Sequence, residues 1–437
     1  MTLIIKNIKT LAKYIPGSSQ DSLVDCEILI RDGKINQLGP AGTIKSDSDT
    51  TQLDGHGLFL APGFIDPQVH FREPGGEKKE DLKSGSLSAV RGGFTTVIAM
   101  ANTNPTIDTP ELILSTYQKS SELGLTRILP TSSVTKSLKG KVLTDFEALK
   151  KAGAVALTDD GKGIQDDQVM EQAMVLAKKV GLPILDHAED ESISKQGAIH
   201  EGEIAKKYNI PGIKSESEAV HVKRGCELSA KTGCHYHVLH ISAKASLDYV
   251  KQAKKNGLPV TCEVSPHHLL LCDLEIPVVE GKVDTNFKMN PPLRSKEDRE
   301  AAVEALLDGT IDAIATDHAP HTEEEKARDI QKAPFGIVGL ETSFPLMYTH
   351  FVKSGKLTLE RLVHLMTSGP AKIFNLPFGT LGIGQSADLT LIDLDSPRKI
   401  NKDQFESKGK NTPFNNWEVY GIPRLTIFEG NIVFNEL

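Results

Sequence analysis

Strand-like apolar runs alternate with helix-like segments from Gly63 to Gly339, and this alternation constrains the fold more than any other feature of the chain. Eight runs follow one another: PGFIDPQVHFREPG, FTTVIAMAN, LTRILPTSS, AVALTDDG, LPILDHAED, YHVLHIS, LPVTCEVSPHH and DAIATDHAPH. Helical patterns lie between them over residues 81–91, 168–180, 217–231, 243–256 and 296–307. Eight β/α alternations favour a closed parallel (β/α)₈ barrel over a doubly wound sheet.

Both ends of the chain are rich in strand patterns. Hairpin turns at Asp32-Gly33 and at Glu429-Gly430-Asn431 lie in these regions. Each end is too short to build a core of its own, so the simplest packing joins them. We therefore predict an α/β protein in which residues 61–375 form a TIM-like barrel. Residues 1–60 and 376–437 together form a small β-sandwich domain.

The composition excludes several classes of protein. The 437 residues include 50 basic and 58 acidic side chains, a net charge of −8, which argues against a nucleic-acid-binding protein. Residues 1–9 lack the apolar core of a secretory signal, and no apolar run is long enough to span a membrane. The five cysteines form no CxxC pair, which indicates reduced thiols. We expect a cytoplasmic protein with a small-molecule ligand.

Polar side chains gather where the predicted strands end, which is the edge where such barrels build active sites. The residues at these ends are His70, Asn102, Asn104, Asp159, Asp160, His187, His240, Asp317 and His321. Three imidazoles and two carboxylates are ligand types of a zinc site, and a bridging carboxylate could hold two ions. Zinc would lower the pKa of a bound water. Asp317 could then act as general base and afterwards as general acid.

Each of these residues also has a purely structural interpretation. Asp159-Asp160-Gly161 has the composition of a tight turn, and His187 could bond to the backbone at a helix entry. His240 alternates away from other histidines on its own strand. His267-His268 are adjacent, so on a strand they would diverge, and we take them only as candidates to support the ligands. All of these residues follow the C-terminal ends of predicted parallel strands, which meet at one rim. This joint placement favours the functional interpretation over the structural one.

A second group suits an anionic substrate with a planar amide or ureido group. Arg72 offers a bidentate fork, and Asn102 and Asn290 offer both a donor and an acceptor, with His321 nearby. A surface salt bridge is the alternative role for Arg72. Residues 323–333, EEEKARDIQKA, are most simply a solvated helix or loop, and a movable lid is the open alternative.

The chain resembles the dihydroorotases of the amidohydrolase superfamily, specifically the class I bacterial type. The segments that carry this resemblance are PGFIDPQVHFREPG, GGFTTVIAMANTNP, TDDGKGI, LDHAED, LHIS, EVSPHH, KMNPPLR, ATDHAPH and PFGIVGLET, in the family's order. The resemblance implies zinc-dependent, reversible ring closure of N-carbamoyl-L-aspartate to L-dihydroorotate in pyrimidine biosynthesis. It also implies a homodimer and raises the question of association with an aspartate transcarbamoylase.

The resemblance also implies roles for individual residues. The family's metal ligands match His70, Asp160, His187, His240 and Asp317, with Asp160 as the bridging carboxylate and Asp317 as the proton shuttle. The groups that hold the substrate carboxylate match Arg72, Asn102 and His321. Asn290 and the backbone around Gly336 match groups that contact the dihydropyrimidine ring. One or two zinc ions per subunit are expected.

One residue departs from the family pattern. The usual His-x-His of the first strand is Gln68-Val69-His70 here, and a neutral amide is a poorer zinc ligand than an imidazole. One metal position could be weakened, empty or completed by water. A catalytically silent partner of aspartate transcarbamoylase is therefore one alternative. A hydantoinase or allantoinase is another, although such enzymes typically bridge their metals with a carboxylated lysine where this chain has Asp159-Asp160.

Overall fold

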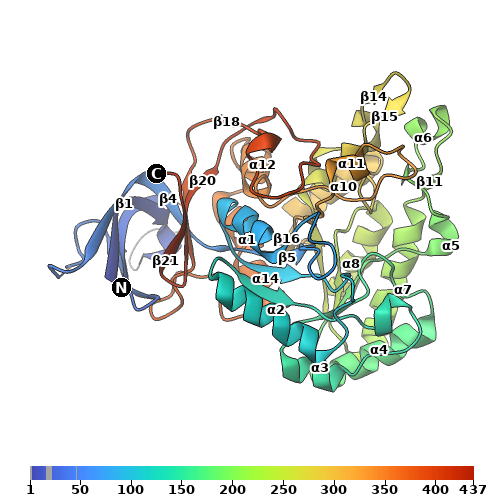
Figure 1. Ribbon diagram of the computed structural model, residues 1–437, viewed down its shortest axis with the longest axis horizontal. Helices are drawn as coiled ribbons and strands as arrows, with labels where there is room; N and C mark the ends of the chain where they lie inside the picture. The colour runs from blue at the N-terminus through green and yellow to red at the C-terminus, as the bar shows by residue number, and fades with distance from the viewer. Residues whose placement is uncertain (1, 16–21, 46) are drawn as a thin grey trace.

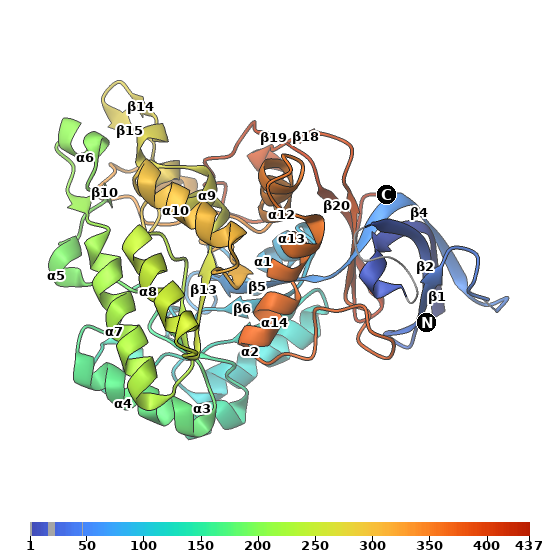
Figure 2. The same cartoon turned by 180° about the vertical axis from the view of Figure 1, so that it is seen from behind.

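The structure is a computed structural model that describes residues 2–15, 22–45 and 47–437. A β-rich part lies at one end of the molecule and a larger α/β part at the other (Figure 1). Both chain termini lie in the β-rich part, which Figure 2 shows from the opposite side. The two ends of the sequence therefore meet in space, as the strand patterns predict.

Strands from both ends of the chain share one seven-stranded sheet of order β21-β20-β17-β4-β1-β2-β3. Their bounds are β1 Thr2–Leu11, β2 Leu23–Arg31, β3 Lys34–Pro40, β4 Thr51–Pro62, β17 Leu389–Asp393, β20 Ile422–Phe428 and β21 Asn431–Asn435. Antiparallel pairing of β17 with β4, from Leu389 opposite Pro62 to Ile392 opposite Phe59, joins the two ends. Apolar side chains from both ends enclose a common core.

Eight parallel strands form the barrel. They are β5 Phe64–Val69, β6 Phe94–Ala99, β7 Arg127–Pro130, β8 Leu157–Thr158, β9 Ile184–Asp186, β12 Tyr236–Val238, β13 Val260–Val264 and β16 Ala313–Ile314. The strands pair in this order within two sheets. Parallel bridges between Ser132 and Leu157, and between Val69 and His318, close the ring. Each strand lies within one of the eight runs recognised in the sequence.

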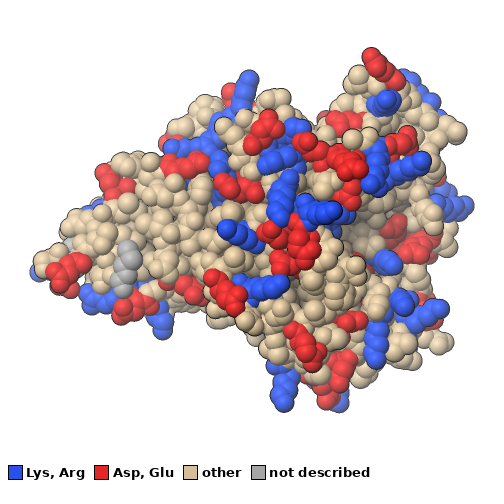
Figure 3. Space-filling model, in the orientation of Figure 1, with Lys and Arg blue, Asp and Glu red and all other residues tan. Residues whose placement is uncertain are grey.

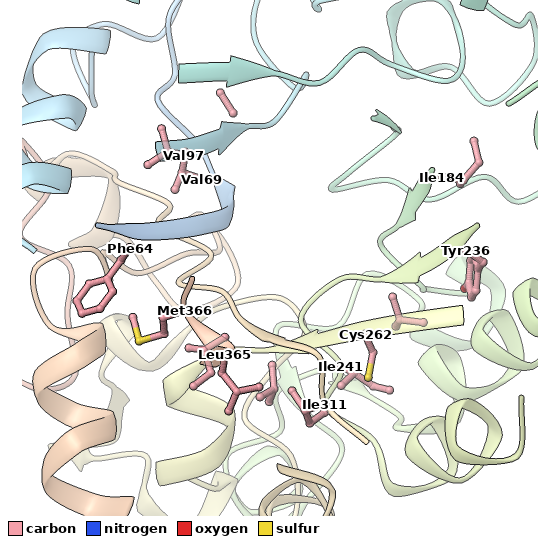
Figure 4. Packing of buried hydrophobic residues seen from close by; sticks show 14 of the residues in the cluster. Phe64, Val69, Val97, Ile184, Tyr236, Ile241, Cys262, Ile311, Leu365 and Met366 are labelled. Atoms are coloured by element: carbon pink, nitrogen blue, oxygen red, sulfur yellow. The ribbon is translucent and has the colours of Figure 1, made fainter. Parts of the chain in front are cut away.

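Helices cover the outside of the barrel. They are α1 Leu82–Arg91, α2 Pro110–Leu123, α3 Phe146–Ala152, α4 Asp167–Val180, α7 Glu216–Thr232, α8 Lys244–Lys255, α10 Lys296–Leu307, α12 Ser343–Met347, α13 Leu359–Leu365 and α14 Ser368–Ile373. Local sequence sets their ends: the Asp166 carboxylate caps the first turn of α4, and Gly181 ends that helix in the left-handed conformation. Buried apolar side chains such as Phe64, Val97 and Tyr236 form the core (Figure 4).

Short elements fill the loops. They are α5 Glu191–Ser194, α6 Glu203–Lys207, α9 Pro266–Leu270, α11 Glu323–Lys326, β10 Ile199–His200, β11 Gly212–Ile213, β14 Val278–Val279, β15 Lys282–Val283, β18 Arg398–Lys399 and β19 Glu418–Val419. Single turns are η1 Ala12–Tyr14, η2 Lys136–Leu138, η3 Asp273–Glu275, η4 Thr285–Phe287, η5 Tyr348–Val352 and η6 Lys402–Gln404.

Two sequence-based expectations need correction. His267 and His268 lie on helix α9, not on a strand, because Pro266 begins a helix directly after β13. Residues 323–333 are not wholly solvated, since Lys326, Ile330 and Ala333 are buried. The division into residues 61–375 and a composite β-rich domain stays a prediction. Ile400 and Phe414, which belong to the C-terminal part of the chain, pack in one apolar cluster with Ile337 from the loops of the barrel.

Candidate active site

A cavity of about 120 Å³ opens at the C-terminal ends of the barrel strands. Its lining residues are His70, Arg72, Asn102, Asp160, Gly161, His187, His240, Asn290, Asp317, Ala319, Phe335 and Gly336. On the face shown in Figure 3, acidic and basic side chains lie around a hollow in the barrel half of the molecule. The structure thus brings together nearly all of the site residues predicted from the sequence.

Asp160, His187 and His240 form a three-ligand cluster, whose potential ligand atoms all lie within 4.8 Å of one another. They follow β8, β9 and β12, so three neighbouring strand ends supply one potential ligand each. Nδ1 of His187 lies 3.4 Å from an Asp160 carboxylate oxygen and 3.0 Å from Nε2 of His240. One carboxylate and two imidazoles are a donor set that suits a divalent metal ion such as zinc.

The electrostatics of this cluster favour positive charge beside Asp160. Burial alone would raise the pKa of Asp160, but hydrogen bonds from His187 and His240 hold it well below its usual range. Burial alone would lower the pKa of His187, but Asp160 and Glu189 outweigh this effect and raise it to about 10. A carboxylate that stabilises an imidazolium in this way also stabilises a bound cation, which would displace the proton.

His70 and Asp317 lie on the opposite side of Asp160. Nε2 of His70 is 3.2 Å from Oδ2 of Asp160 and 3.0 Å from Oδ1 of Asp317. Its other ring nitrogen lies 2.9 Å from the side-chain oxygen of Asn102. His70 follows β5 and Asp317 follows β16, and these two strand ends meet where the barrel closes. Asp317 therefore faces the same cavity as the three-ligand cluster.

Gln68 is fully buried on β5 and points at the same carboxylate. Its side-chain amide donates a hydrogen bond of 3.3 Å to Oδ2 of Asp160, and its oxygen has no partner among the described residues. Nδ1 of His240 likewise has no partner in the described part of the chain. Gln68 thus stands beside the metal cluster as a hydrogen-bond donor to Asp160.

Arg72 and His321 contact each other at the rim. The Arg72 guanidinium lies 3.3 Å from Nε2 of His321 and donates to the carbonyl of Pro320. Burial lowers the pKa of Arg72 to about 10, so it stays charged at neutral pH. Burial and the nearby Arg72 and Lys79 lower the pKa of His321 to about 2, so this imidazole is neutral. A half-buried guanidinium that faces a cavity is suited to bind a carboxylate.

Arg72 lies in a turn beyond the end of strand β5. The strand β5 ends at Val69, and Arg72 has a φ of +57°. The turn continues to Gly75, where a Cβ would lie 1.9 Å from the carbonyl oxygen of Asn104, so only glycine fits. The loop after β5 therefore contacts the loop after β6, which carries Asn102.

Asn290 lies on the other side of the cavity. Its side-chain nitrogen donates to Glu189 at 2.7 Å and lies 3.2 Å from Nε2 of His187. Gly336 lies nearby with a φ of +130°, and a Cβ there would meet the Cβ of Ala319 at 2.6 Å. Only glycine allows the backbone to approach the cavity so closely.

Sequence reasoning missed three residues that organise the site. Glu189 accepts from both Asn290 and His187, and its place two residues after His187 in LDHAED is a signal that could have identified it. Asn411 bonds the carbonyls of Ala319 and Gly336. Lys326 donates to the carbonyl of Gly336 at 3.0 Å. Asn411 lies far from any motif. Lys326 follows ATDHAPH by five residues, but it stands in the charged run EEEKARDIQKA, which indicates a solvated surface.

Comparison with known proteins establishes the family. Residues 57–246 match the model described as Dihydro-orotase-like, and residues 309–434 match the Amidohydrolase family model. A protein named dihydroorotase from Bacillus subtilis (strain 168) is 52% identical over 100% of this chain and 99% of that protein. Another, from Shouchella clausii (strain KSM-K16), is 52% identical over 94% of each chain. The chain belongs to the dihydroorotase family of the amidohydrolase superfamily.

These relatives support dihydroorotase function and confirm the family and the hydrolase class inferred from the sequence. The fold class is confirmed by solved structures. An L-hydantoinase (dihydropyrimidinase) from Arthrobacter aurescens matches with a TM-score of 0.85 at 29% identity, over 99% of this chain and 96% of that one. A dihydropyrimidinase from Brevibacillus agri NCHU1002 matches with a TM-score of 0.82 at 22% identity, over 100% and 95%. The described helices include none that could cross a membrane.

Proposed function

We propose that this chain catalyses the reversible, zinc-dependent ring closure of N-carbamoyl-L-aspartate to L-dihydroorotate. The observation that carries the proposal is the meeting, in one cavity, of the three-ligand cluster with the half-buried guanidinium of Arg72. A metal site suits the hydrolysis of a cyclic amide, and the guanidinium suits a substrate that carries a carboxylate. The dihydroorotase relatives support the same substrate.

We propose that Asp160, His187 and His240 hold a zinc ion, and that His70 and Asp317 complete the metal site. The donor set fits zinc, and the low pKa of Asp160 keeps that carboxylate ionised for binding. When bound, zinc supplies Lewis acidity that polarises the amide carbonyl and lowers the pKa of a water molecule. Gln68 offers one unpartnered amide oxygen at this site, which suits a second ion less well than an imidazole.

We propose that Asp317 moves the proton. In the hydrolytic direction a water oxygen bonds to the ring carbonyl carbon, and the bond from that carbon to the ring nitrogen breaks. The Asp317 carboxylate takes the proton from the water and delivers it to the leaving nitrogen, so that the carboxylate is regenerated. Its hydrogen bond of 3.0 Å with His70 holds Asp317 at the cavity wall. Ring closure runs through the same proton transfers in reverse.

We propose that Arg72, Asn102 and His321 bind the substrate carboxylate. Arg72 supplies the charge and the donors, while His321, whose one N–H donates to the carbonyl of Phe335, lies beside the guanidinium as a neutral imidazole. Asn290 and the backbone of Gly336 would contact the planar ureido edge of the ring from the opposite wall. The cavity would thus fix both ends of the substrate.

The proposal is tested by assaying the purified chain in both directions, before and after removal of metal with a chelator. We expect turnover of L-dihydroorotate and of N-carbamoyl-L-aspartate that is lost on chelation and returns with zinc. Hydantoin and allantoin serve as comparison substrates, because a hydantoinase-type match at 29% identity makes a cyclic amidase the second candidate. Faster turnover of hydantoin than of L-dihydroorotate would favour that second candidate.

We propose a cytoplasmic homodimer. All five cysteines are free and buried, which fits a reducing compartment. Association with an aspartate transcarbamoylase is a further proposal that rests on the resemblance to the family. Sedimentation of the purified chain, alone and mixed with the transcarbamoylase of the same source, tests both. A sedimenting monomer would contradict the homodimer.

A further inference from the structure

Two buried lysines outside the metal site lie behind one wall of the cavity. The exposed fraction is 2% for Lys288 and 4% for Lys326. Lys288 precedes Asn290 by two residues, and Lys326 ends the short helix α11. Burial of an ammonium group is costly unless all its donors are hydrogen-bonded. Their burial therefore needs a structural or functional reason.

Lys288 uses its ammonium group to hold the segment after α11. It donates to the carbonyls of Ile330 at 2.5 Å and Ala333 at 2.6 Å, with a longer contact of 3.4 Å to the carbonyl of Gln331. The ammonium also lies 4.4 Å from the ring centroid of Phe335, where a cation–π attraction adds to the contact.

Lys326 holds the end of the same segment, where it meets the cavity. It donates to the carbonyls of Lys288 at 3.2 Å, Pro334 at 3.1 Å and Gly336 at 3.0 Å. An ammonium group has three donors, and each of these two lysines makes three such bonds. Neither has a donor left for a ligand, so the two ammonium groups serve the protein backbone.

The segment of residues 330–336 forms a wall of the cavity, and we call it the carbonyl wall. Phe335 and Gly336 line the cavity itself. The Gly336 N–H donates to the carbonyl of Lys288 at 3.0 Å, so both backbone groups of Gly336 are fixed. The Phe335 carbonyl lies 2.8 Å from Nε2 of His321. A shift of this wall would therefore move both the ring-contacting backbone and His321.

We propose that Lys326 is a positioning residue for substrate binding, which it serves by anchoring the carbonyl wall against the cavity. This inference rests on the proposed function, because it takes the ring of L-dihydroorotate as the group that lies on the wall. Lys326 touches no reacting atom in this account. It acts through Gly336 and, by way of the adjacent Phe335, through His321.

The test compares Lys326→Met, Lys326→Gln and the control Lys332→Met, which alters an exposed lysine in the same segment. For Lys326→Met we expect KM for L-dihydroorotate to rise about tenfold while kcat changes by less than about threefold, as for lost uniform binding. The Gln variant keeps two donors, so its KM should lie between those of Lys326→Met and the wild type. The control should match the wild type, and the zinc content of all variants should be unchanged.

Amide hydrogen exchange supplies a readout that does not depend on activity. We expect faster amide exchange in residues 330–336 of Lys326→Met than in the wild type. The exchange rates in strands β1, β2, β3 and β4 should be the same in both. An unchanged KM, or a fall in kcat alone, would overturn the inference. Faster exchange throughout the chain would also overturn it, because that result indicates a general structural role. A wild-type chain without turnover would instead contradict the proposed function, and exchange in the carbonyl wall would still decide whether Lys326 anchors it.

Discussion

The two sides of Asp160 differ in kind. On one side lie His187 and His240, whose ring nitrogens converge with the carboxylate as a compact ligand set. On the other side, the β5 side, lie Gln68, His70 and Asp317, where the Gln68 amide hydrogen-bonds to Asp160 in place of a second imidazole on that side. From this difference we infer that affinity for metal and movement of the proton are divided between the two sides of Asp160. The first side is suited to retain the ion, and the β5 side to carry out proton transfer.

The largest effect is expected from removal of Asp160, which both sides share. Asp160→Ala should lower zinc affinity by more than about 100-fold and should abolish turnover. This loss exceeds the one expected when a residue that merely hydrogen-bonds to a metal ligand is removed. The measurement is metal content after dialysis, together with the assay of L-dihydroorotate hydrolysis.

Asp159→Asn is the matched control for this variant. Asp159 is the adjacent carboxylate, but it accepts hydrogen bonds from the backbone and side chain of Thr135 and does not join the ligand cluster. The Asp159→Asn variant should therefore keep its zinc. Equal loss of zinc from both variants would contradict the assignment of Asp160.

The next largest effect separates the two sides. Asp317→Asn should lower kcat by about 10²–10⁴-fold, because the amide cannot take a proton from water. Zinc should remain bound by the three-ligand cluster, so metal content checks that the loss is chemical. The surface variant Asp308→Asn is the control. A kcat within tenfold of the wild type would show that another group moves the proton.

A smaller and selective effect is expected at the rim. Arg72→Met should lower kcat/KM for L-dihydroorotate by an amount equivalent to about 2–5 kcal/mol, because the carboxylate of the bound substrate would lose its charged partner. Dihydrouracil has the same ring without the carboxylate. We expect the wild type to hydrolyse it slowly, and Arg72→Met to hydrolyse it no more slowly than the wild type. The exposed Arg328→Met is the control. An equal loss for both substrates would argue that Arg72 supports the fold and not the carboxylate.

The smallest effect concerns Gln68 itself. Gln68→His should raise metal affinity on the β5 side by about tenfold, because imidazole binds zinc better than a neutral amide. Metal content and binding affinity, measured beside Gln68→Leu, give the readout. If Gln68→His and the wild type retain the same amount of zinc with the same affinity, the site does not use a ligand at this position.

The barrel could be predicted because its strands have a local signal. Apolar runs that end in polar residues mark β5, β9 and β12, and even the two-residue strands β8 and β16 lie within such runs. Helices α2 and α3 lie outside the predicted ranges, although Pro110 at the start of α2, the Asp145 cap of α3 and the glycines that end both helices are boundary signals. The sequence Ser265-Pro266 is a helix start that outweighs the strand interpretation of His267-His268.

The site was only partly predictable for a different reason. Strand ends of one polarity meet at one rim, so His70, Asp160, His187, His240 and Asp317 could be grouped from the order of the sequence. The burial of Lys326 depends on carbonyl groups that converge only after folding. A charged run such as EEEK predicts a solvated surface, and only the tertiary structure shows that its lysine is the exception.

We propose that a metal ion held by the three-ligand cluster makes this chain a metal-dependent dihydroorotase. The most direct test is to titrate the chelated, metal-free chain with zinc while the hydrolysis of L-dihydroorotate is followed. We expect no turnover at the start. Turnover should then rise with added zinc in the wild type, but not in His187→Ala or His240→Ala. Absence of turnover with zinc and with every other divalent metal tested would contradict it, as would full turnover without metal.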